Sequence, residues 1–310
     1  MYQIGIDIGG TSIKFGIVDE HLNIIRRSAV PFRPIGSESV ATMIRQEVDT
    51  LLAQEPVIGQ VGSIGVVVPG SLDRTHSTVL DAHNLNFHNV PFRMQLQAQF
   101  PDTPVYLAND ADGAALAELG CGAFTGCKTA VLLTLGTGVG GGVILGGKLF
   151  SGGERRGTEL GHMTLVNGGE PCTCGNLGCA EAYCSATALI REGIRAAKEN
   201  PGSALARYDY SSMDAETVID CAKQGDETAK SVFDRYVDHL AAACASVIHI
   251  LDPEVIAIGG GVGQAGEILF EPLRKLTNEK CFFSDHGAIV PAVMGNHAGI
   301  IGAAMLAQHM

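Results

Sequence analysis

Two segments far apart in the chain share one pattern: a strand, a glycine-rich turn and a second strand. Residues 2–18 read YQIGIDIGGTSIKFGIV, and residues 130–145 read AVLLTLGTGVGGGVIL. The likeness lies in the pattern and not in the identities, because short apolar runs of strand length flank the glycines in both segments. Two copies of one such unit indicate a duplicated fold with a cleft between its halves.

The rest of the chain alternates strands with helices, as an α/β fold requires. Residues 61–70, VGSIGVVVPG, form a nearly continuous apolar run, which is typical of a strand buried on both faces. Residues 37–54 and 226–251 carry apolar side chains at helical spacing. A length of 310 residues suits about two domains of ~150 residues each.

The charge balance argues against two classes of partner. The formal net charge is −12, which disfavours nucleic acid or an anionic membrane surface as the main partner. No apolar run approaches the ~18 residues of a membrane span. The chain opens on a strand without a basic leader, so we expect a cytoplasmic protein. In that reducing compartment, close cysteines are metal ligands more often than disulfides.

Three glycine turns follow strands, at residues 7–11, 136–142 and 259–263. Backbone N–H groups in such turns can point at phosphate oxygens because no Cβ stands in the way, and a Thr hydroxyl adds a donor. Any one of them alone would be an ordinary tight turn. Three at the carboxyl ends of strands favour a bound nucleotide. Asp7, at the end of the first strand, could hold Mg²⁺ through water.

The segment PCTCGNLGCAE, residues 171–181, holds three cysteines in eight positions. Three thiolates and one imidazole suit a structural, tetrahedral Zn²⁺ with no open position for chemistry. The expected ligands are His162, Cys172, Cys174 and Cys179. A cysteine-only set that uses Cys184 is the alternative, and no C-x-x-C pair supports a redox role. We expect the other cysteines to be small buried hydrophobes: Cys121, Cys127, Cys221, Cys244 and Cys281.

Taken together, the motifs have a recognisable order: DIGGTSIKFGIVD, LANDAD, LGTGVGGGVI, GTELGH, CTCGNLGCAE, IAIGGGV and AGIIGAA. This order resembles the ROK family of repressors, open reading frames and sugar kinases, and the resemblance runs nearly end to end. It implies an α/β, duplicated actin-like (ribonuclease-H-like) ATPase fold with sugar and ATP in the interdomain cleft. It further implies a smaller domain of residues 1–108 plus 296–310, and a larger one of residues 109–295 that carries the zinc.

The resemblance also implies roles for single residues. Asp110, which by itself would be part of a helix N-cap, becomes the general base that accepts the proton of the attacking sugar hydroxyl. His162 would bind zinc through one ring nitrogen and the sugar through the other. The residues expected to bind the sugar are Gly70, Asn84, Asn109, Asp110, Glu159, His162 and Glu181. Those expected to bind the nucleotide are Asp7, Gly9, Gly10, Thr11, Gly136, Thr137, Gly138, Gly140, Gly259, Gly260 and Gly261.

The function implied is ATP-dependent phosphorylation of a hexose at its 6-hydroxyl, with glucose as the expected acceptor. N-acetylmannosamine or another hexose is the alternative acceptor, and polyphosphate is the alternative donor. A sugar-responsive repressor is the remote alternative, since the first glycine-turn strand begins at residue 2 and leaves no room for a DNA-binding module. We expect a homodimer. Arg155 and Arg156 depart from the small or apolar residues usual in the family, and their role is left open.

Overall fold

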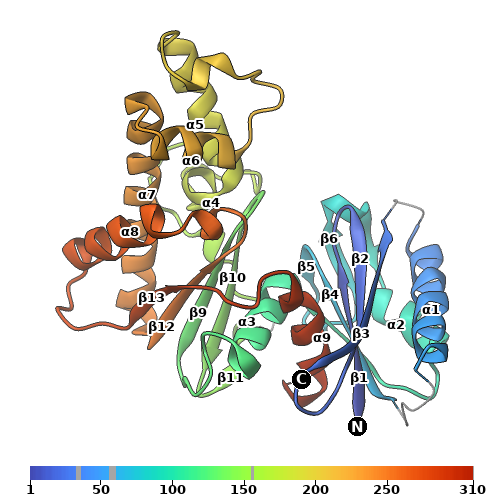
Figure 1. Ribbon diagram of the computed structural model, residues 1–310. Coiled ribbons are helices and arrows are strands. Elements are labelled where there is room, and N and C mark those ends of the chain that lie inside the picture. The colour runs from blue at the N-terminus through green and yellow to red at the C-terminus, as the bar shows by residue number, and fades with distance from the viewer. Residues whose placement is uncertain (33–35, 56–60, 155–156, 310) are drawn as a thin grey trace. The chain divides into compact units, whose positions relative to one another are not determined.

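The computed structural model describes residues 1–32, 36–55, 61–154 and 157–309 (Figure 1). The chain forms two compact units. The first comprises residues 1–128, 142–158 and 294–310, and the second comprises residues 129–141 and 159–293. The first unit thus also holds residues 109–128 and 142–158, which the sequence-based division assigns to the larger domain. That division stays a prediction about folding domains.

The first unit is built on a five-stranded sheet of order β3-β2-β1-β4-β8. Its strands are β1 (Tyr2–Ile8), β2 (Ser12–Val18), β3 (Ile24–Pro31), β4 (Val61–Val68) and β8 (Val105–Asn109). β1, β4 and β8 run parallel, whereas β2 is antiparallel to both of its neighbours. The carboxyl ends of β1, β4 and β8 therefore meet at one edge of the sheet, the edge at which ligands bind in open α/β sheets.

Helices cover both faces of this sheet. In β4, Ile64, Val66 and Val68 pack into a core with α1 (Ser37–Ala53) and α2 (Phe92–Gln99). Val67 points the other way, to α3 (Asp110–Cys121) and α9 (Ala298–His309). This double burial explains the continuous apolar run of residues 61–68. The remaining elements of the unit are β5 (Ser71–Leu72), β6 (Val79–Ala82), η1 (His83–Leu85), β7 (Phe87–Val90), β11 (Lys148–Leu149) and η5 (Gly295–His297).

A row of glycines lets α9 lie directly on the sheet. Gly16, Gly5 and Gly65 are cross-strand neighbours on β2, β1 and β4. A Cβ on Gly5 would overlap the carbonyl oxygen of Ile300, and one on Gly65 would overlap that of Ala303. The small residues of the segment AGIIGAA match this close approach from the helix side.

The second unit holds the parallel strands β9 (Ala130–Leu135), β12 (Val255–Gly259) and β13 (Ala288–Pro291). They belong to a sheet of order β11-β10-β9-β12-β13, and the boundary between the units falls within β10 (Val139–Leu145). Its other elements are η2 (Leu160–His162), α4 (Glu181–Cys184), α5 (Ala186–Glu199), η3 (Leu205–Arg207), α6 (Ala215–Lys223), α7 (Glu227–Leu251), η4 (Val262–Ala265) and α8 (Glu267–Lys280).

The long helix α7 confirms the helical spacing read from the sequence. Its predicted apolar stripe is buried from Phe233 to Val247, and Leu251 at the end is partly exposed. None of the helices within the described ranges has the length and apolar character that a membrane crossing needs.

Candidate functional site

In the first unit, polar residues gather at the carboxyl edge of β1, β4 and β8. Asp7 on β1 pairs with Val67 on β4, and Asn109 on β8 pairs with Val68, so the two residues lie one position apart at the carboxyl ends of their strands. Asn109 Nδ2 donates to the carbonyl oxygen of Gly70 at 2.8 Å. Two residues that the sequence assigned to the sugar pocket are thereby joined directly.

Gly70 is required by the backbone at this point. Its φ of +96° lies in the left-handed region, and a Cβ would overlap the carbonyl oxygen of Asp81. The turn after β4 therefore packs against the end of β6, next to the short helix η1 that carries Asn84.

Asn109 and Asp110 have separate tasks. Asn109 is the N-cap of α3, and its Oδ1 accepts from the Ala111 amide at 2.8 Å. Asp110 is the first helical residue, and its Oδ1 lies 2.9 Å from the same amide. Asn109 supplies the cap, and the Asp110 carboxylate lies in the first turn of α3, where the helix dipole stabilises a negative charge. Asp112, the second acid in the first turn of α3, is only 2 % exposed.

The first glycine turn lies beside Asn84. The Gly9 amide donates to the Ser12 carbonyl oxygen at 2.9 Å and closes the turn between β1 and β2. A Cβ built on Gly10 would sit 3.4 Å from the Asn84 Cβ. Burial raises the pKa of Asp7, and Lys14, whose Nζ is 3.6 Å away, opposes that shift. A mostly buried carboxylate next to a glycine turn fits a water-mediated Mg²⁺ site.

In the second unit, the other two glycine turns lie side by side. Gly259 at the end of β12 pairs with Thr134 on the parallel strand β9. Gly260 has a φ of +80°, and a Cβ there would overlap the backbone of Leu135. The turns at residues 136–140 and 259–261 therefore leave neighbouring strands at the same edge, as a shared phosphate site requires.

The turn at residues 136–140, hereafter the second glycine turn, is fixed to the start of α4 and α5. The Gly136 carbonyl oxygen accepts from the Ala186 amide at 2.8 Å. Thr187 Oγ1 donates to the Thr137 carbonyl oxygen at 2.8 Å. The Val139 amide donates to Glu181 Oε2 at 3.2 Å. Three hydrogen bonds thus hold the turn in one shape.

The predicted metal ligands come together. One ligand atom from each of the four residues lies within 4.8 Å of all the others. His162 Nδ1 is 3.5 Å from Cys172 Sγ, and the sulfurs of Cys174 and Cys179 are 3.6 Å apart. Tetrahedral zinc with bonds of about 2.0–2.3 Å needs its ligands roughly 3.3–3.8 Å apart. The cluster therefore fits Zn²⁺, with Nδ1 of His162 as the nitrogen ligand.

The pKa values of the thiols differ within the cluster. Burial and the neighbouring thiols raise the pKa of Cys179 to about 12, whereas the Asn176 amide lowers that of Cys174. Thiols this close ionise together only when a positive charge is present, and a bound metal supplies it. Zinc would act here as a structural ion that fixes residues 171–180, hereafter the cysteine loop.

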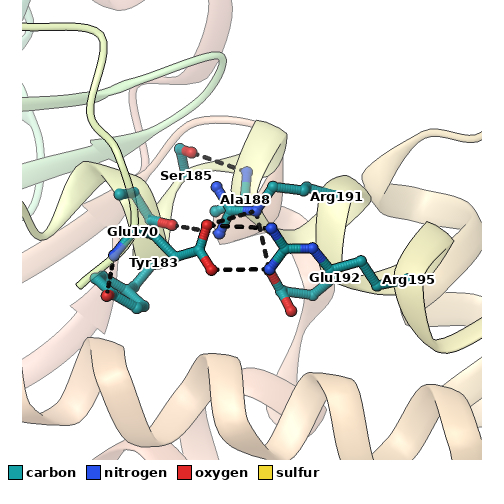
Figure 2. A network of polar contacts seen from close by, with 8 residues as sticks. Glu170, Tyr183, Ser185, Ala188, Arg191, Glu192 and Arg195 are labelled. Atoms are coloured by element: carbon teal, nitrogen blue, oxygen red, sulfur yellow. Dashed lines mark hydrogen bonds and ion pairs between the residues drawn. The ribbon is translucent and has the colours of Figure 1, made fainter. Parts of the chain in front are cut away.

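A second polar network holds the segment before the cysteine loop (Figure 2). The Glu170 carboxylate is paired in a fork with Arg195, at 2.8 and 3.2 Å, which holds the pKa of Glu170 below its usual range. The Glu170 amide donates to Tyr183 Oη at 2.7 Å, and its carbonyl oxygen accepts from the Gly178 amide at 2.8 Å. The network therefore joins the cysteine loop to α4 and α5.

Comparison with known proteins decides the family. The sequence profile of the ROK family matches residues 3–310. The chain belongs to the ROK family. It is 39 % identical to a glucokinase of Thermotoga maritima, over 98 % of this chain and 96 % of that protein. It is 31 % identical to an N-acetyl-D-glucosamine kinase of Citrobacter koseri, over 97 % of this chain and 98 % of that protein.

A solved ROK structure agrees with the fold. The crystal structure of a ROK family glucokinase from Streptomyces griseus, in complex with glucose and AMPPNP, superposes with a TM-score of 0.82 at 32 % identity. The match covers 99 % of this chain and 100 % of that one. The duplicated α/β architecture expected from the two strand–turn–strand segments is thereby confirmed.

The structure corrects two expectations about the cysteines, one about the metal ligands and one about burial. The alternative cysteine-only set is wrong for the described residues, because Cys184 is fully buried beside Cys244 and outside the cluster. Cys221 and Cys244 are buried as expected, but Cys121 is exposed, and Cys127 and Cys281 are partly exposed. Cys121 is the last residue of α3, and its sulfur is 3.7 Å from Met294 Sδ.

The remaining expectations concern Glu159 and the two arginines that precede it. Glu159 is exposed just before η2, and its carbonyl oxygen accepts from the His162 amide at 3.0 Å. Arg155 and Arg156, whose role the sequence left open, lie outside the described residues. Thr173 and Thr187 were not predicted; their hydroxyls bond Glu181 and the second glycine turn. The sequence signal for these contacts was a threonine within or next to an identified motif. Threonines in such places are too common for that signal to identify a functional residue.

Proposed function

We propose that this chain transfers the γ-phosphoryl group of ATP to the 6-hydroxyl of glucose. The observation that carries the proposal is the position of Asp110, a carboxylate that directly follows β8 at the carboxyl edge of the sheet. The full-length match to glucokinases supports the same activity.

Asp110 is the general base of the proposed reaction. Its carboxylate accepts the proton of the sugar 6-hydroxyl as that oxygen attacks the γ-phosphorus in line, and the bond from phosphorus to the bridging oxygen of ADP breaks. The products are glucose 6-phosphate and ADP. Hydrogen bonding to Asp110 also orients the hydroxyl before the attack.

The sugar is held by amide, carboxylate and imidazole groups that match its hydroxyls. Nδ1 of His162 faces the cysteine sulfurs, so Nε2 is the nitrogen proposed to bind the sugar. The other proposed sugar ligands are Gly70, Asn84, Asn109, Glu159 and Glu181.

The glycine turns bind the nucleotide in this proposal. Their backbone N–H groups, with the hydroxyls of Thr11 and Thr137, donate to phosphate oxygens. Mg²⁺ would neutralise charge on the β- and γ-phosphates, and Asp7 is the residue proposed to hold it through water. The proposed zinc site has a structural role, because its four protein ligands leave no open position.

A coupled assay over a panel of hexoses and amino sugars, with ATP and Mg²⁺, tests the proposal. Glucose should give the highest kcat/KM, and the product should carry phosphate on O6. Polyphosphate in place of ATP tests the donor, and sedimentation tests the proposed homodimer.

The second candidate function is an amino sugar kinase, which the 31 % identity to an N-acetyl-D-glucosamine kinase favours. N-acetylmannosamine belongs in the panel for the same reason. If an N-acetylated sugar exceeds glucose tenfold in kcat/KM, which is about 1.4 kcal/mol of transition-state preference, the glucose assignment is wrong.

A further inference from the structure

The carboxylate of Glu181 stands between the cysteine loop and the second glycine turn. Its Oε2 accepts from the Val139 amide at 3.2 Å. Its Oε1 accepts from the hydroxyl of Thr173 at 2.6 Å. Thr173 lies between two proposed zinc ligands, Cys172 and Cys174, and is not itself one of the four proposed ligands.

The net negative charge expected on the zinc cluster explains why the Glu181 carboxylate needs the hydrogen bond from Thr173. Cys172 Sγ lies 3.5 Å from Glu181 Oε1. Three thiolates, a neutral imidazole and one Zn²⁺ leave the cluster with one net negative charge, since −3 and +2 sum to −1. A carboxylate at this distance is repelled unless donors hold it in place. The described donors to its two oxygens are the Thr173 hydroxyl, the Val139 amide and the Cys172 thiol, and the thiol would no longer donate once it binds zinc as a thiolate.

We propose that Thr173 is a positioning residue, whose hydroxyl aims the Glu181 carboxylate for sugar binding. This inference rests on the proposed function, in which Glu181 binds a sugar hydroxyl. The bond from Thr173 fixes one oxygen, so that the remaining lone pairs of the carboxylate face the sugar in a single orientation. The cysteine loop therefore supplies two anchors for sugar ligands, zinc for His162 and Thr173 for Glu181.

Replacing the hydroxyl with a methyl group tests this role. Thr173→Val keeps the shape of the side chain and removes the donor, whereas Thr173→Ser keeps the donor. Glucose binding without nucleotide, measured by calorimetry, should weaken about fivefold in Thr173→Val, the scale of one partly exposed hydrogen bond to a carboxylate. Thr173→Ser should restore most of that loss.

Two further readouts separate positioning from general damage to the loop. Zinc content should stay at the wild-type value in Thr173→Val, because no ligand is lost. The KM for glucose should rise about fivefold while kcat and the KM for ATP change less than about twofold, since Ala186 and Thr187 still hold the second glycine turn. Thr42→Val is the matched control, because the Thr42 hydroxyl bonds to the Glu38 carbonyl oxygen within α1 and belongs to neither the cysteine loop nor the glycine turns.

Three results would overturn the proposal: unchanged glucose affinity in Thr173→Val, loss of zinc in that variant, or an equal loss in Thr173→Ser. A different result marks failure of the proposed function: the wild-type protein neither binds nor phosphorylates glucose. The Thr173 variants are then compared on the sugar that the panel identifies, and the same three results decide.

Discussion

At the scale of the residue, His162 is where metal and substrate meet. Its Nδ1 lies among the cysteine sulfurs, which leaves Nε2 as the nitrogen proposed for the sugar. A zinc ion bound to Nδ1 would fix both the tautomer and the ring orientation. A structural metal can therefore influence substrate binding through one side chain without taking part in the chemistry.

The link between zinc and sugar can be tested by Cys174→Ser. We expect zinc content, measured by elemental analysis, to fall well below one per chain, because one of four ligands is lost. Glucose affinity should fall with it by about tenfold, since His162 loses its anchor. Cys121→Ser is the control, because Cys121 lies outside the cluster. Zinc loss with unchanged glucose affinity would break this link.

At the scale of the element, the row of glycines under α9 weakens the strands but permits close packing of the helix on the sheet. Glycine in a strand interior weakens the strand and offers no side chain to the core. Here Gly5 and Gly65 allow the backbone of α9 to touch the sheet. α9 is thereby fixed to β1 and β4, the strands that carry Asp7 and lead to Gly70.

Gly65→Ala tests this packing. The new methyl group would overlap the Ala303 carbonyl oxygen, so α9 must move away from the sheet. We expect the free energy of unfolding, measured by urea denaturation, to fall by about 1–3 kcal/mol. Gly202→Ala, where a Cβ meets nothing within 4 Å, should change it by less than about 0.5 kcal/mol. Equal stability of the two variants would show that α9 does not depend on the glycine row.

Periodicity and spacing predicted most of these elements, for physical reasons. The apolar run of β4, the stripe of α7 and the spacing of the zinc ligands each leave a local signature in the sequence. The hydrogen bonds of Thr173 and Thr187 leave none, because they depend on how the chain folds back on itself: Thr173 bonds to Glu181 at the start of α4, and Thr187 bonds to Thr137 in the second glycine turn. The burial of Asp112 and the exposure of Cys121 depend likewise on which helix face packs, and residue type alone does not determine that.

At the scale of the whole molecule, the two units carry different parts of the proposed machinery. Asp7, Asn84 and Asp110 belong to the first unit, and Glu181 and the zinc ligands belong to the second. The sequence-based division also separated Asp7 and Asn84 from Glu181 and the zinc ligands, but it assigned Asp110 to the larger domain, with the zinc ligands. The exact bounds of each unit could not be predicted from the sequence, because they depend on α3 and residues 142–158 packing with the first unit.

The central claim is that Asp110 accepts the proton of the sugar hydroxyl, and Asp110→Asn tests it most directly. Asparagine keeps the shape and a hydrogen-bond partner but cannot accept the proton. Asp214→Asn is the matched control, because Asp214 caps α6 and is exposed. With ATP and glucose, we predict that kcat of Asp110→Asn falls by roughly 10²–10⁴ while glucose binding without nucleotide changes far less. A folded Asp110→Asn protein with near wild-type kcat would contradict the account.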